Sequence, residues 1–228
     1  MSTKPPLSAP VLVLLLFSIS VLPSCQQTPV PEPEFVSLLN GRDLAGWIGD
    51  PRLWEVAEGV IVGSTEQVKL THNSFLSTRT SYSDFVLRVS VKLRNGNSGI
   101  QFRGEQFPDY VVKGYQADVA VETYFGMLYD EGGRGIMEYW KRMTPQEQTH
   151  INSAARLDDW NLYEIRCQGD HIKMILNGQV VCEIEDPEGA SEGIIALQLH
   201  VGDPMKVMFK DIEIKDLSED ESEKRKPR

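Results

Sequence analysis

Three short stretches of the chain carry polar side chains at every second position, with apolar residues between them. They span residues 97–103, 114–119 and 193–200, and their polar members are Gln101, Arg103, Gln116, Asp118, Gln198 and His200. Sugar hydroxyls both donate and accept hydrogen bonds, so amides, a carboxylate, a guanidinium and an imidazole can all pair with them. The three stretches therefore predict a sugar-binding surface, if they lie next to one another.

The alternative is that these polar side chains only satisfy one another on a solvated surface. For any single residue that interpretation is favoured, but the repetition in three separate stretches favours a site. Gly99 lies between polar residues, which suggests that a polar ligand approaches this face closely. Flanking aromatic residues, Tyr129 and Trp140 among them, could stack on the faces of a sugar ring.

A glycine-rich segment at 126–135 contains Glu131 and Arg134. It lacks the Lys-Ser/Thr pair of a phosphate-binding loop, and the acidic pair before its glycines argues against a phosphate ligand. Glu131 and Arg134 either form a weak surface ion pair across the turn or belong to the rim of a site. In the second case Glu131 is a candidate acid, and Arg134 is a candidate substrate contact.

The elements that position these residues read as strands. Successive side chains of a strand point to opposite faces, and this alternation is clear at 85–92, 97–103 and 162–167. Asn177-Gly178 predicts a tight hairpin turn, and Thr144-Pro145 is typical of a short helix start. Trp47 and Trp54 are expected in the core. Many short strands separated by Gly and Asn turns predict an all-β protein, a sandwich of two antiparallel sheets.

The two ends of the chain differ from this pattern. Residues 1–24 combine Lys4, an apolar run and small residues, as in a signal peptide. Cys25 follows Leu-Pro-Ser, which resembles the lipidation motif of bacterial lipoproteins, with an ordinary signal peptide and an incidental Cys25 as the alternative. Residues 25–34 would then be a lipidated tether, 35–217 the folded domain and 218–228 a charged, disordered tail. We expect an exported lipoprotein, anchored by lipid only on the periplasmic or cell-surface side.

Charge and cysteine content restrict the partners. A net charge of -10 argues against nucleic acid, which needs a basic surface. Cys167 and Cys182 lie in neighbouring predicted strands, and either a disulfide or two buried free thiols fits the sequence. No His/Cys pattern with metal-ligand spacing occurs. No cofactor is predicted with certainty, although a divalent cation held by acidic groups stays open.

Several motifs occur in the order in which a known family has them. They are the Phe35–Trp47 segment with Asn40-Gly41 and Gly46-Trp47, Trp54-Glu55-Val56 with Gly59-Val60-Ile61, the 97–103 stretch, 193–200, and 207–214. The chain thereby resembles the 3-keto-disaccharide hydrolase domain family over Phe35 to Leu217. The resemblance implies a concanavalin A-like jelly-roll sandwich and action on glycosides oxidised to a ketone at sugar carbon 3. Where this family commonly has a Glu, the chain has Gln116.

The resemblance also implies a mechanism. A 3-keto group acidifies the hydrogen on carbon 2, so a base can remove it, the aglycone leaves from carbon 1, and water adds back. Asp118 or His200 would be the base, Arg103 the stabiliser of the enolate oxygen and Glu131 a second candidate acid. Gln101, Gln116 and Gln198 would orient hydroxyls. The alternatives are a non-catalytic, lectin-like carbohydrate-binding module and a structural domain of the cell envelope.

Overall fold

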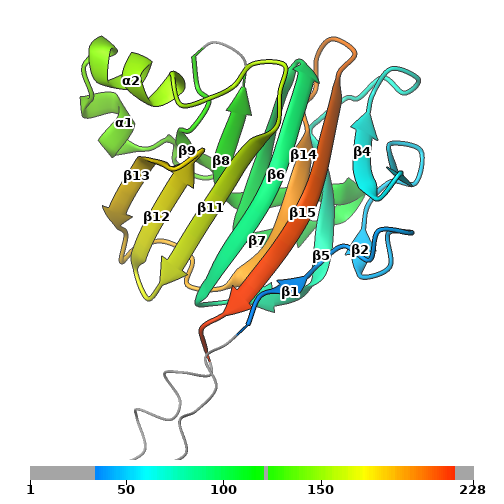
Figure 1. Cartoon of the computed structure of the whole chain (residues 1–228), viewed down its shortest axis with the longest axis horizontal. Helices are drawn as coiled ribbons and strands as arrows, with labels where there is room; N and C mark the ends of the chain where they lie inside the picture. The colour runs from blue at the N-terminus through cyan, green and yellow to red at the C-terminus, as the bar shows by residue number, and fades with distance from the viewer. Residues whose placement is uncertain (1–33, 121–122, 219–228) are drawn as a thin grey trace, which may run out of the picture. The chain divides into compact units, whose positions relative to one another are not determined.

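Two antiparallel sheets face each other in the computed structural model, which describes residues 34–120 and 123–218 (Figure 1). The first sheet runs in the order β13 (Gln179–Glu185), β12 (His171–Leu176), β11 (Asn161–Gln168), β6 (Phe85–Asn95), β15 (Lys206–Asp216), β4 (Val60–Ser64) and β3 (Trp54–Ala57), with β1 (Val36–Ser37) also paired to β15. The second runs in the order β10 (Gly135–Ile136), β9 (Leu128–Glu131), β8 (Val111–Ala120), β7 (Asn97–Phe107), β14 (Gly193–Leu199), β5 (Ser74–Tyr82) and β2 (Trp47–Ile48). The predicted all-β jelly-roll sandwich is confirmed.

The core lies between the two sheets and follows from the alternation of the strands. In β6, Phe85, Leu87, Val89 and Val91 are fully buried, whereas the residues between them are less buried or half-exposed. Strand β11 alternates in the same way and pairs with β6 in register. Burial of one apolar face per sheet is what stabilises such a sandwich. The predicted core positions of Trp47 and Trp54 are confirmed, since each side chain is 4% exposed.

The predicted hairpin turn and the predicted helix start are both confirmed, but a second helix was not predicted. Asn177 and Gly178 have φ values of 50° and 87°, as a type I′ hairpin requires, and they join β12 to β13. Thr144 caps α2 (Pro145–Asn152) through a reciprocal hydrogen-bond pair with Glu147. Helix α1 (Glu138–Arg142) was not predicted, because five residues without clear periodicity give little signal.

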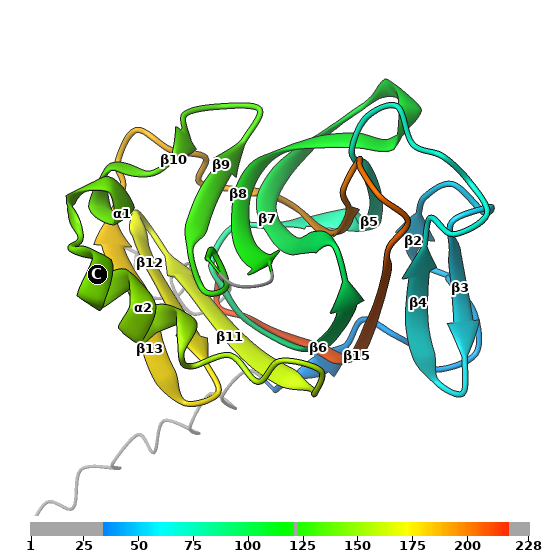
Figure 2. The same cartoon turned by 90° about the horizontal axis from the view of Figure 1, so that it is seen from above.

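The β7–β8 hairpin bends over the outer face of the second sheet. The bend is a bulge between Phe102 and Glu105, and a short 3-10 turn (Pro108–Tyr110) closes the hairpin tip. Beyond the bend, Val112 joins a small buried apolar cluster with Phe75, Ile194 and Ala196. Figure 2 shows β7 and β8 curling in this way. A face that would be open in a flat sheet is thereby covered.

Several predictions concern the ends of the chain. The signal peptide, Cys25 and nearly all of the predicted tether and tail lie outside the described residues. Within the described residues, no helix has the length and apolar character needed to cross a membrane. Cys167 and Cys182 are free and buried, which decides between the two possibilities that the sequence left open.

Candidate functional site

The three polar stretches lie side by side, because β8, β7 and β14 are neighbours in the second sheet. Gln101 pairs with Gln116 on one side and with Ala196 on the other, and Gly99 pairs with Asp118. The expectation that the stretches share one sheet is therefore confirmed. The side chains of Gln101, Gln116, Asp118 and Gln198 lie on the outer face, opposite the core.

Three amides and one carboxylate form a hydrogen-bonded floor on this face. Gln101 Nε2 donates to Gln116 Oε1 at 3.3 Å, and Gln116 Nε2 donates to Asp118 Oδ1 at 2.7 Å and to Gln198 Oε1 at 3.5 Å. All four side chains are buried. Among the described residues, Gln101 Oε1 and Gln198 Nε2 have no hydrogen-bond partner. The floor therefore leaves one acceptor and one donor unpaired, on two different side chains.

Gly99 serves the floor in a way that the sequence did not suggest. A Cβ at this position would lie 2.3 Å from Cδ of Gln116. The glycine thus makes room for the side chain of Gln116, which lies across it. The close approach expected of a ligand is made here by the protein itself.

Asp118 is the floor residue with the most altered acidity. Burial raises its pKa to about 7 from an ordinary 3.8; the hydrogen bond from Gln116 opposes this shift, and the negative charge of Glu131 adds to it. Below the side chain, Tyr163 of the facing sheet donates to the backbone oxygen of Asp118 at 2.5 Å and accepts from the backbone nitrogen of Gly126 at 2.9 Å. A tyrosine that spans the core therefore fixes the backbone that presents this carboxyl group.

Glu131 and His200 are connected through Asn73. The Asn73 amide donates to Glu131 Oε1 at 2.9 Å, and its oxygen accepts from the backbone nitrogen of Val201, also at 2.9 Å. His200 Nδ1 lies 2.6 Å from the Val201 oxygen, which can only accept. The proton of the neutral ring is therefore on Nδ1, and Nε2 is left as an acceptor.

A cavity of about 560 Å³ opens beside this floor. Its walls are Ser81, Arg103–Gln106, Lys113, Gly114, Asp130–Gly133, Ala190 and Glu192–Ile194. Of the four predicted catalytic residues, Glu131 and Arg103 line it, whereas Asp118 and His200 do not. Glu131 is thus the link between the cavity and the buried carboxyl of Asp118.

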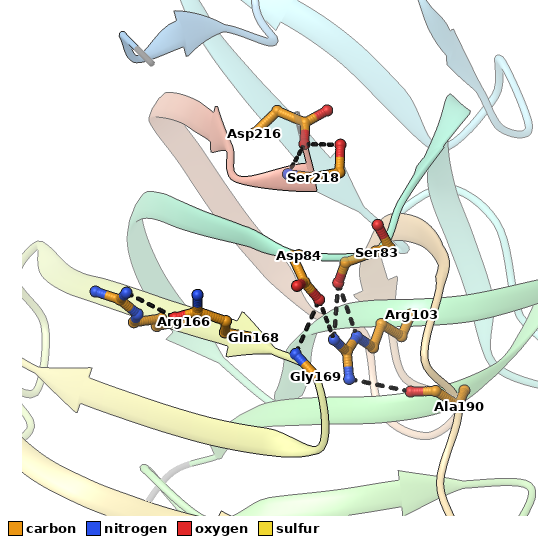
Figure 3. Close-up of polar contacts among 9 residues, drawn as sticks. All are labelled: Ser83, Asp84, Arg103, Arg166, Gln168, Gly169, Ala190, Asp216 and Ser218. Carbon is orange, nitrogen blue, oxygen red and sulfur yellow. Dashed lines mark hydrogen bonds and ion pairs between the residues drawn. The ribbon is translucent and has the colours of Figure 1, made fainter. Parts of the chain in front are cut away.

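The role predicted for Arg103 needs correction. Its guanidinium donates to the backbone oxygens of Ser83 and Ala190 and to Asp84 Oδ1, and the residue is 3% exposed (Figure 3). The prediction assumed unbroken alternation, but Arg103 has a φ of 49° at the bulge, which redirects its side chain. Arg103 clamps the turn before β6 to the bend of β7 and the loop before β14.

Two of the six predicted substrate-binding residues, Trp140 and Arg134, are also occupied by the protein. Trp140 is 3% exposed and packs in the core, so it offers no ring face to a sugar. Arg134 bonds Asp130 at 2.7 Å and Asp186 at 2.6 Å, so it pairs with these residues and not with Glu131. Tyr129 remains beside the site: it pairs with Gln116, and its pKa is raised by burial and by the charges of Glu131 and Asp118.

Other groups of the site carried no signal in the sequence. Asn73 lies just before β5, and Tyr163 is an ordinary inward residue of β11, so neither stands out from its neighbours. Lys113 lines the cavity, and nothing in the sequence around it marked it as part of a site. In the described part of the chain, no three His, Cys, Asp or Glu side chains are grouped so that they could hold a metal ion.

Comparison with known proteins agrees with the fold. The family model described as the 3-keto-alpha-glucoside-1,2-lyase-like domain matches residues 34–215. No curated protein matches the sequence.

Solved structures with the same fold include proteins that differ widely in sequence. A presumed glycosyl hydrolase from Parabacteroides distasonis ATCC 8503 is 21% identical with a TM-score of 0.58, over 80% of this chain and 94% of its own. The carbohydrate-binding module CBM66 from Bacillus subtilis is 20% identical with a TM-score of 0.55, over 80% and 100%. At these identities the likeness shows the fold alone.

Proposed function

The chain belongs to the 3-keto-alpha-glucoside-1,2-lyase-like domain family, and from this membership we propose that it acts on carbohydrate at the outer face of the second sheet. The cavity of about 560 Å³ is in the size range of small-molecule sites. Its walls carry the carboxylates of Glu105, Glu131 and Glu192 and the ammonium of Lys113, groups that form hydrogen bonds with sugar hydroxyls.

The reaction is the cleavage of a 3-keto-glycoside. A base takes the hydrogen on carbon 2, and the electron pair of that bond moves into the enolate of the carbon 3 ketone. Collapse of the enolate breaks the bond between carbon 1 and the glycosidic oxygen, and an acid protonates the departing oxygen. Water then adds across carbons 1 and 2, so the net result is hydrolysis.

Glu131 is the base in this proposal, because it is the carboxylate of the predicted set that lines the cavity. Asp118 is the acid and acts through an intervening water, since it is 6% exposed and lies off the cavity wall. Lys113, a cation of the wall, replaces Arg103 as the stabiliser of the enolate oxygen. The observation that carries the proposal is the cavity of about 560 Å³ with Glu131 on its wall, and the charge of Glu131 also helps to raise the pKa of the buried Asp118.

The test compares a 3-keto-glucoside with the corresponding ordinary glucoside. We expect aglycone release from the keto substrate alone, with a loss of about 100-fold or more in Glu131→Gln and in Asp118→Asn. Glu55→Gln, an exposed glutamate on the facing sheet, is the matched control and should leave the rate unchanged. Equal rates for Glu131→Gln and the unaltered protein would remove Glu131 from the mechanism.

A non-catalytic, lectin-like module is the second candidate. Gln116 favours it, because this residue stands where the family commonly has a Glu and here holds Asp118 by a hydrogen bond. Saturable binding of the keto-glucoside without release of aglycone would support this candidate.

Export and anchoring are also proposed, on the pattern of residues 1–25. Cys25 would carry the lipid, and the domain would lie on the periplasmic or cell-surface side. Membrane fractionation of a Cys25→Ser variant tests this: the protein should move from the membrane to the soluble exported fraction.

A further inference from the structure

The walls of the cavity are unusually rich in charge. Six of the lining residues are ionisable: Arg103, Glu105, Lys113, Asp130, Glu131 and Glu192. What these groups do to a ligand depends on which of them are already engaged by the protein.

Two of the six are paired with an opposite charge within the fold. The guanidinium of Arg103 lies 3.3 Å from Asp84, and Asp130 is bonded to Arg134 at 2.7 Å. Arg103 therefore adds no net charge to the ligand space, whereas the charge of Asp130 is only partly cancelled, because Arg134 is shared with Asp186.

The other four leave the wall acidic. Glu105 and Glu192 are exposed, and neither carboxylate forms a hydrogen bond or ion pair with another described residue, although Glu105 lies opposite Lys113 in the pairing of β7 with β8. Among the residues that the structure describes, the Glu131 carboxylate accepts a side-chain hydrogen bond only from the neutral amide of Asn73. Lys113 is the opposing cation, and its ammonium lies 4.8 Å from the ring centroid of Phe107. Three carboxylates therefore face one ammonium group.

A buried acceptor next to the cavity is a second, independent feature of this region. Gln101 Oε1 is buried, has no partner among the described residues, and lies 3.4 Å from where a Cβ on the cavity residue Gly104 would stand. A carbonyl oxygen accepts hydrogen bonds and cannot donate them. An acceptor of this kind next to the wall favours hydroxyl and ammonium groups over a carboxylate or sulfate.

We propose, on the premise of the carbohydrate function above, that this cavity selects saccharides without acidic groups. It takes neutral sugars and amino sugars, and it excludes uronic acids and sulfated or phosphorylated sugars. Glu105 and Glu192 are specificity-determining residues, because they are the wall carboxylates that remain free and take no part in the proposed chemistry.

The test is a titration of the full chain with disaccharides of glucose, glucosamine and glucuronic acid at low salt. We expect glucosamine to bind about fivefold or more tighter than glucuronic acid, with glucose between them. Raising the salt to about 0.5 M should shrink this range, because the Debye length falls to a few ångströms.

Two double variants distinguish the effect of the wall charges from that of the net charge of the protein. The double variant Glu105→Gln/Glu192→Gln should reduce the preference for glucosamine over glucuronic acid severalfold, because it removes two of the three wall carboxylates. Glu55→Gln/Glu213→Gln makes the same change in net charge on the facing sheet and should leave the preference intact.

Each outcome has a separate meaning. Glucuronic acid binding as tightly as glucosamine would overturn the selectivity and leave the carbohydrate function standing. An unchanged preference in Glu105→Gln/Glu192→Gln would remove these two residues as its cause. Failure of all three disaccharides and of the keto-glucoside to bind would overturn the proposed function itself.

Discussion

At the scale of single residues, Asp118 makes stability depend on pH. Its pKa is about 7 in the folded chain against an ordinary 3.8, so the folded state holds one more proton between these values. The unfolding free energy should therefore fall as pH rises from about 4 to about 7, by up to about 4 kcal/mol, and level off above that.

Asp118→Asn tests this dependence without reference to activity. The amide oxygen of Asn can still accept from Gln116, but the side chain no longer loses a proton. Urea unfolding at several pH values should show the unfolding free energy of the variant rising relative to that of the unaltered protein from pH 4 to 7. A constant difference between the two proteins over that range would contradict the raised pKa.

Arg103 is expected to matter for stability and not for ligand contact. Arg103→Met leaves the oxygens of Ser83 and Ala190 and the carboxylate of Asp84 without their buried cation, which should cost about 3–5 kcal/mol. Arg166→Met is the control, because the exposed Arg166 side chain bonds only Gln168 among the described residues, and the variant should stay within about 0.5 kcal/mol of the unaltered protein (Figure 3). Equal unfolding midpoints for the two variants would contradict the clamp.

At the scale of elements, alternation placed the glutamines and Asp118 correctly on one face. It placed Arg103 wrongly, because alternation carries no sign of a bulge at which the chain takes a positive φ. It also gave no hint that the β7–β8 hairpin would fold over this face. Contacts such as Asn73 with Glu131 join residues that are distant in sequence, so no local pattern could reveal them.

Gly99 gives the element-scale prediction. An added methyl group in Gly99→Ala meets the Gln116 side chain and should cost about 1–3 kcal/mol. Gln116→Ala removes the obstacle, so Gly99→Ala should cost about 1 kcal/mol less in that background. Additive effects in this double-mutant cycle, measured by chemical unfolding, would show that the glycine is needed for another reason.

At the scale of the whole molecule, the two-sheet architecture followed from composition, turns and alternation. Whether the two core cysteines form a disulfide could not be predicted in this way, because it depends on the geometry across the strands. Cys167 and Cys182 lie on strands β11 and β13, which are separated by β12, and burial raises the pKa of each thiol to about 12. Such thiols are poor nucleophiles.

The two buried thiols should be unreactive as long as the protein is folded. In a Cys25→Ser variant, a thiol reagent at pH 8 should find no reactive thiol until denaturant is added, and then two. The midpoint of unfolding should not change with a reducing agent. Loss of stability on reduction would indicate a disulfide instead.

The central claim, that a hydrogen is taken from carbon 2, has a direct measurement. A 3-keto-glucoside is incubated with the protein in D₂O, and the released 3-keto-glucose is examined at once by NMR, with protein-free substrate as the control for spontaneous exchange. Elimination followed by addition of water predicts deuterium on carbon 2 of the product, with both release and labelling lost in Glu131→Gln. Aglycone release that leaves hydrogen on carbon 2 would contradict the account.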